Sequence, residues 1–119
     1  MMPNPVVRWQ IISPKPGATA SFYQKLFDWS LSKDNALGYR ELKAGENGMD
    51  GGVWPGPPEE RPFAQIFIEV PSVDEYIERA TALGAAVLVP ASVLPDGDVM
   101  AVLKDPVGLP FAICSKAVN

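Results

Sequence analysis

The stretch AQIFIEVPSVDEYIERATALGA, residues 64–85, decides the fold, because a strand pattern is followed after a short break by a helix pattern. In the first seven residues the side chains alternate with the period of a β-strand, so two faces are predicted. One face carries Gln65, Phe67 and Glu69, and the other, expected under the helix, carries Ile66, Ile68 and Val70.

The helix pattern begins at Ser72, a good N-cap residue, and Glu75 three residues later completes a capping-box sequence. Gly84 suits the end of the helix. Apolar residues recur at helical spacing between these two points and predict a buried stripe of Val73, Ile77, Ala80 and Leu83.

Three further strands are predicted after this helix, in AVLVP (86–90), DVMAVLK (98–104) and LPFAICS (109–115). The turn DPVG joins the last two, with Pro at its second position and Gly at its fourth.

The first half of the chain has the same order. VVRWQIIS (6–13) predicts a strand with Arg8 and Gln10 on one face and Trp9 and Ile11 on the other. Residues 17–27 predict a helix that ends at Asp28, and WSLS, YRELKA and MDGGVW predict three short strands. The expected buried stripe of this helix is Ala20, Tyr23, Leu26 and Phe27.

The order βαβββ therefore occurs twice, as a repeat of pattern rather than of identity. We expect a single α+β domain with modules at about residues 5–56 and 62–116, linked by the proline-rich connector at residues 55–62. The two modules should form a curved mixed sheet around a cleft, with the helices on the outside. The pattern leaves open whether that cleft forms within one chain or between chains.

The composition argues against several kinds of partner and site: nucleic acid, anionic membranes, disulfides and sites built on histidine. The chain has 119 residues, a net charge of −4 and no run of Lys or Arg, so neither nucleic acid nor an anionic membrane is an expected partner. One cysteine, Cys114, excludes an internal disulfide, and no signal peptide or membrane span is predicted, so we expect a cytoplasmic protein. Histidine is absent, which removes the commonest general base and the commonest transition-metal ligand.

Three segments in this order resemble the glyoxalase/bleomycin-resistance/dioxygenase group, the vicinal oxygen chelate superfamily. They are ATASFYQKLFDW (18–29), VPSVDEYIERATALGAAV (70–87) and VLKDPVGLPFAI (102–113). The resemblance covers nearly the whole chain and implies the fold, but this fold hosts many functions.

The resemblance also implies where a metal would bind, and the residues there are unsuitable. The family's ligand positions on the first, fifth and last strands fall on Arg8, Gln65 and Ala112, and the fourth falls near residues 51–54, which hold no carboxylate. A guanidinium cannot coordinate a cation and repels it. We therefore expect a divergent member with no bound metal and no cofactor.

Several residues are candidates for contact with a ligand in the cleft. Arg8 suits either an anionic ligand or an ion pair with Glu69 or Glu41. Gln65 suits either a ligand carbonyl or a neighbouring strand, Glu69 is either a general base or a solvated carboxylate, and Trp54 either stacks on a ligand or covers an interface. The full set is Arg8, Gln10, Glu41, Trp54, Gln65, Phe67, Glu69 and Ala112.

Three classes of function follow. The first is a metal-free protein that holds a small organic molecule in its cleft, as resistance or sequestration proteins do. The second is a lyase or dioxygenase-type enzyme that uses substitute carboxylate ligands such as Glu41, Asp50 and Glu69. The third is a non-catalytic dimeric interaction module. A symmetric homodimer is expected from the large aromatic residues Trp9, Trp29, Trp54 and Phe63.

Overall fold

The computed structural model describes residues 3–31, 40–55, 61–94 and 97–116. The chain divides into two compact units. The first unit is Arg8–Gln65, and the second unit is Ile66–Asn119 together with Met1–Val7. The division falls inside the two strands that start the βαβββ repeats, β1 and β5. Most of the connector predicted at residues 55–62 lies outside the described residues.

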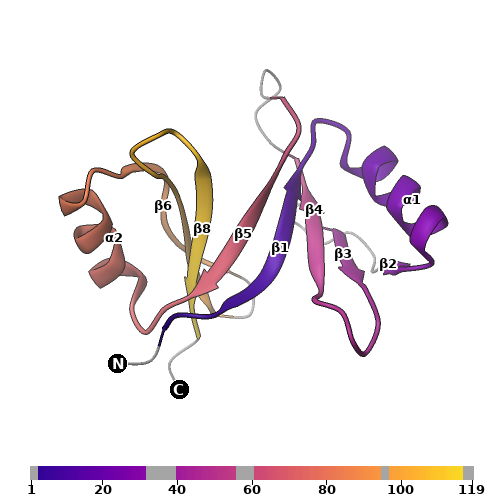
Figure 1. Ribbon diagram of the computed structural model, residues 1–119, viewed down its shortest axis with the longest axis horizontal. Helices are drawn as coiled ribbons and strands as arrows, with labels where there is room; N and C mark the ends of the chain where they lie inside the picture. The colour runs from indigo at the N-terminus through magenta and orange to yellow at the C-terminus, as the bar shows by residue number, and fades with distance from the viewer. Residues whose placement is uncertain (1–2, 32–39, 56–60, 95–96, 117–119) are drawn as a thin grey trace. The chain divides into compact units, whose positions relative to one another are not determined.

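The first repeat runs β1 (Val6–Ile12), α1 (Pro16–Phe27), β2 (Ser30–Leu31), β3 (Arg40–Lys43) and β4 (Gly51–Trp54). Hydrogen bonding orders its strands β2-β3-β4-β1. β1 is parallel to β4, whereas β3 is antiparallel to both β2 and β4. Helix α1 lies beside β2 and β3 in Figure 1.

The second repeat runs β5 (Phe63–Glu69), α2 (Val73–Ala82), β6 (Ala86–Val93), β7 (Val99–Lys104) and β8 (Pro110–Ser115). Its strands are ordered β5-β8-β7-β6, with β5 parallel to β8 and the other pairs antiparallel. The predicted α+β class, with two βαβββ modules and mixed strand pairing, is confirmed.

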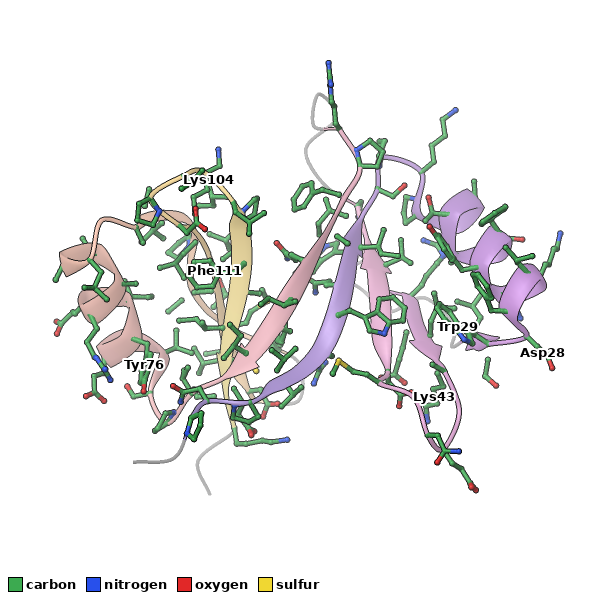
Figure 2. All side chains as sticks on the ribbon, viewed as in Figure 1. Asp28, Trp29, Lys43, Tyr76, Lys104 and Phe111 are labelled. Atoms are coloured by element: carbon green, nitrogen blue, oxygen red, sulfur yellow. The ribbon has the colours of Figure 1, made fainter. Side chains whose placement is uncertain are left out.

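Each helix buries one face of the strands in its own unit. Ala20 of α1 packs with Leu42 and Val53 in the first unit. In the second unit Val73 of α2 packs with Leu103 and Ile113. Phe111 and Ile68 border this second core, and Figure 2 labels Phe111 on β8 and Tyr76 on α2. Residues that alternate with these must point away from the helices.

Four residues expected to be buried, three in the helix stripes and one on the strand face under α2, are exposed instead. Leu83 is 80% exposed because α2 ends at Ala82, so helical spacing no longer applies to it. Leu26 and Phe27, in the last turn of α1, are 60% and 52% exposed. Ile66 is 47% exposed, and it lies outside the core under α2 that Ile68 and Val70 join.

The helix ends follow the local sequence. The Ser72 hydroxyl accepts a hydrogen bond from the Glu75 N–H at 3.3 Å, as the capping pattern predicts. Asp28 ends α1 in the left-handed conformation with φ 59°, which Asp tolerates better than most residues. Within the part of the chain that the structure describes, no helix is long and apolar enough to cross a membrane.

The predicted DPVG turn is built on one carboxylate. Asp105 Oδ1 accepts hydrogen bonds from the backbone N–H groups of Leu109, Val107 and Gly108 at 2.8–3.0 Å. The bond from Leu109, with help from the other two, holds the pKa of Asp105 below its ordinary value of 3.8. The carboxylate therefore stabilises the folded state above about pH 4, and this contribution is lost as the pH falls through the lower folded-state pKa.

Asp105→Asn should consequently lower the melting temperature at pH 7. The difference from wild type should shrink below about pH 4, where the wild-type carboxylate also becomes protonated. Thermal melts from pH 2.5 to pH 7 would measure this, with Glu46→Gln in an exposed turn as the control. A deficit that stays constant across this range would contradict the assigned role of the charge.

Candidate functional site

The face of the first unit that points away from α1 gathers most of the candidate residues. Trp9, Ile11 and Val53 pack under α1, so the alternating residues of β1, β3 and β4 lie on the opposite face. Gly52 is the register partner of both Gln10 on β1 and Glu41 on β3, and Trp54 is the partner of Ile12. Three strands thus place Gln10, Gly52 and Glu41 in one row.

Gln65 joins this row through a buried amide pair. Its Nε2 donates to Gln10 Oε1 at 2.5 Å, across 55 residues of sequence. Gln10 is 2% exposed and Gln65 is 5% exposed. The Gln65 Oε1 is buried and has no hydrogen-bond partner among the described residues. A buried acceptor without a partner costs about 1–3 kcal/mol, so this oxygen requires an explanation.

Two charged side chains, Arg8 and Glu41, lie on the same face as the Gln10–Gln65 amide pair. Arg8 is two residues before Gln10 on β1, and therefore on the same face, and it is half-buried, as is Glu41. Both side chains have interaction partners, so neither is a free charge. The guanidinium stays positive at any pH that a protein tolerates and offers paired donors to a carboxylate or phosphate.

The remaining candidates belong to the second unit. Phe67 and Ala112 are register partners on β5 and β8, and they are 2% and 0% exposed. Phe111 and Ile113 pack against the α2 core, so Ala112 points away from α2, as the alternation predicts. Glu69 lies 3.8 Å from Lys116 Nζ in an ion pair at the surface, which holds it weakly.

The family's metal does not fit this donor set. Arg8 repels a cation, Gln65 offers only a neutral amide already paired with Gln10, and Ala112 has no donor atom. The substitute ligands do not gather either: in the ranges that the structure describes, no three His, Cys, Asp or Glu side chains come close enough to hold a metal ion. Asp50 Oδ1 instead accepts from the Ala44 N–H at 3.0 Å.

A hollow lies on the α1 side of the first unit. This groove of about 500 Å³ is lined by Ile11, Ala18, Thr19, Phe22, Tyr23, Pro62, Phe63 and Ala64. Its lining is mostly apolar, and the hydroxyl of Thr19 is already paired with Ser13 at 2.7 Å. The face with the amide pair therefore has the better groups for orienting a polar ligand.

Sequence reasoning missed the part that Gly52 plays. The signal was the Gly51-Gly52 pair inside a predicted strand, because a glycine there marks a place where another group approaches closely. Gly52 puts no side chain between Gln10 and Glu41, whereas Gly51 accommodates Trp9 on the opposite face.

Comparison with known proteins places the chain in a family. A family model for the glyoxalase-like domain matches residues 9–114. A search of curated protein sequences gave no significant match.

Solved structures agree on the fold. Methylmalonyl-CoA epimerase from Mycobacterium tuberculosis superimposes with a TM-score of 0.69 at 14% identity, over 99% of this chain and 94% of the epimerase. A glyoxalase/bleomycin resistance protein/dioxygenase superfamily member from Vibrio splendidus 12B01 gives 0.64 at 11% identity, over 92% and 97%. The Mn(II)-bound glyoxalase from Novosphingobium aromaticivorans gives 0.61 at 16% identity, over 93% of this chain and 37% of its own.

At these identities the structural likeness establishes the fold and leaves the activity open. The family model spans both βαβββ repeats, and the resemblance seen in three sequence segments is confirmed. This chain therefore belongs to the glyoxalase-like domain family.

Proposed function

We propose that this protein binds a small organic molecule, neutral or anionic, without a metal ion, on the face of the first unit that carries Gln10 and Gln65. The observation that carries the proposal is the buried Gln65 Oε1 without a described partner. Proteins rarely leave such a group unpaired, and the exceptions are concentrated at functional sites. A ligand N–H or O–H would supply the missing donor.

The oxygen is closed to solvent in this conformation, so a ligand would reach it only after the Gln65 side chain moves. This movement breaks the hydrogen bond to Gln10 Oε1, and the bonds to the ligand must offset that loss. The amide could then present its oxygen or its NH₂ to a ligand, while Arg8 on the same face would attract a carboxylate or phosphate. Sequestration, as in a resistance protein, needs no more than this. An enzyme with substitute carboxylate ligands would need three of them together, and the described residues do not provide that group.

A thermal-shift screen against metabolites and antibiotics tests the proposal. A ligand present at 100 times its dissociation constant should add about 2.7 kcal/mol to the free energy of unfolding. Gln65→Leu should weaken a hit by about 1–3 kcal/mol, because a ligand donor is left unpaired, and Arg8→Ala should weaken an anionic hit by about 1.5–3 kcal/mol. Gln24→Leu, on α1, is the matched control and should leave affinity unchanged.

A double variant separates binding from stability. Gln10→Leu with Gln65→Leu removes both amides, and replacement of both polar partners by apolar groups is often neutral or stabilising. We expect this variant to melt at or above the wild-type temperature and to lose the ligand. A hit that binds the double variant as tightly as the wild type would end the proposal.

A further inference from the structure

The turn between β3 and β4 carries an asparagine followed by a glycine. The turn is AGENGMD, residues 44–50, and Glu46, Asn47 and Gly48 are all exposed. Figure 1 shows it as the loop that joins β3 to β4, and Figure 2 labels Lys43, the last residue of β3. Asparagine is a thermally labile residue, and the glycine after it has no Cβ to hinder an approach to its nitrogen. The Asn47 side chain is therefore open to attack by the backbone nitrogen of Gly48.

Two comparable sequences in the described residues are protected from this reaction. Asn4 precedes Pro5, whose backbone nitrogen carries no hydrogen and cannot close a ring in this way. Asp50 precedes Gly51, but its Oδ1 accepts a hydrogen bond from the Ala44 N–H at 3.0 Å, and Gly51 is buried in β4. The exposed pair at residues 47–48 has neither form of protection.

The same turn has no room for a longer backbone. The Gly48 N–H donates to the Gly45 carbonyl at 3.2 Å, and a Cβ placed on Gly48 would lie 2.9 Å from the Ala44 carbonyl oxygen. The carbonyl of the next residue, Met49, accepts the hydrogen bond from Trp9 Nε1 at 2.7 Å. An added backbone atom before Gly48 would break the turn or displace the Met49 carbonyl, and either change would release the Trp9 indole.

Trp9 links this turn to the interior of the first unit, because it packs against the core cluster of Ala20, Leu42 and Val53. We propose that Asn47 deamidates spontaneously in the folded protein, and that its isoaspartate product destabilises the first unit by releasing Trp9. The proposal is independent of ligand binding, because the reacting groups are not among the residues proposed to contact the ligand.

The reaction needs only water as a co-reactant. The Gly48 nitrogen, after loss of its proton, attacks Cγ of Asn47, and ammonia leaves as a succinimide ring forms. Water then opens the ring: cleavage of the bond from the Gly48 nitrogen to Cγ gives aspartate, and cleavage of its bond to the Asn47 backbone carbonyl carbon gives isoaspartate. Both products add one negative charge to the net charge of −4. Isoaspartate also carries the chain through its Cβ, and so lengthens the backbone by one atom.

Incubation of the folded protein at 37 °C and at pH 7, 8 and 9, followed by ion exchange and peptide mass mapping, tests the proposal. An acidic form changed at Asn47 should appear, with isoaspartate as its main product. Its rate should rise about tenfold per pH unit, because only the deprotonated Gly48 nitrogen attacks. Asn47→Ser should not yield this form, since serine also favours turns but has no amide to lose.

Thermal melts then separate the longer backbone from the added charge. The purified isoaspartate form should melt about 5 °C or more below the unmodified protein, whereas Asn47→Asp, which adds the charge alone, should stay within about 3 °C. An Asn47 that remains intact in the folded protein over the time in which it converts in concentrated urea would overturn the proposal. So would an isoaspartate form that melts at the temperature of Asn47→Asp.

Discussion

Replacement of Ala112 by glutamate should remove much of the stability of the fold, by about 3–5 kcal/mol at pH 7.5, because an unpaired carboxylate would be buried. Ala112 is 0% exposed and is held in register between Phe67 on β5 and Val102 on β7. Neither neighbour offers a cation or a side-chain hydrogen-bond donor. Urea denaturation of the purified variant would measure the loss.

The pH dependence identifies the cause. Desolvation should raise the pKa of the new carboxyl in the folded state above its ordinary value of about 4.3. The unfolded chain then loses the proton first, so the stability of Ala112→Glu should fall as the pH rises above about 4.3. Ala18→Glu is the matched control, because Ala18 is exposed in the first turn of α1, where a negative charge is neutral or favourable.

This prediction also bears on the metal. The family resemblance implies a glutamate at this strand position. Ala112 is 0% exposed, however, so the neighbouring residues leave room for its methyl group and not for a longer side chain. Adding Mn²⁺ or Zn²⁺ to Ala112→Glu should therefore not restore its stability, since one carboxylate with Arg8 and Gln65 is not a competent ligand set. A variant as stable as the wild type at pH 7.5, or one whose stability is restored by metal, would show that the space around residue 112 is more open than the structure indicates.

Gly51→Ala should destabilise the first unit by about 2–3 kcal/mol, because the indole of Trp9 occupies the space that a side chain needs. A Cβ at Gly51 would lie 2.1 Å from Trp9 Cδ2 and 2.4 Å from Cε2 and Cε3. The ring cannot easily shift, since its Nε1 donates to the Met49 carbonyl at 2.7 Å and its centroid lies 5.3 Å from that of the Trp29 ring, which is tilted by 37°. Chemical denaturation at pH 7 would give the difference in unfolding free energy.

Gly17→Ala supplies the contrast. A Cβ there would lie 3.5 Å from Arg40 Nη2, an ordinary contact, and Gly17 is in α1. Alanine should stabilise this helix position by about 0.5–1 kcal/mol. In a Trp9→Leu background, Gly51→Ala should lose most of its cost, and a cost that persists there would show that the ring is not responsible.

Much of the fold could be predicted because its signals are local. Alternation in residues 64–70, the capping sequence at Ser72 and the turn at Asp105 each depend on neighbours within a few residues. Most of the predictions of burial that were wrong concern residues near the ends of helices, where a local pattern does not show which side chains the rest of the fold covers. Leu83 continues the apolar spacing of α2 after the helix itself has ended, and Leu26 lies in the last turn of α1.

The candidate site could be predicted only in part. Alternation identifies Gln10 and Gln65 as residues that point away from the helices, and the structure shows this for Gln10, whose neighbours Trp9 and Ile11 pack under α1. Their hydrogen bond and their burial could not be foreseen, because the partners are 55 residues apart and the contact depends on how strands pair. The same is true of Gly52, whose importance depends on its partners in β1 and β3.

The membership of the N-terminal residues in the second unit has a consequence for synthesis. The Glu69 N–H donates to the Pro5 carbonyl at 3.0 Å, and the Tyr76 hydroxyl donates to Asn4 Oδ1 at 3.2 Å. Asn4 leaves the peptidyl transferase centre 72 residues before Tyr76, a delay of about 4–14 s at ordinary translation speeds. Asn4 and Pro5 are therefore synthesised well before their partners, and the second repeat can complete its packing only by binding residues that are made before most of the first repeat.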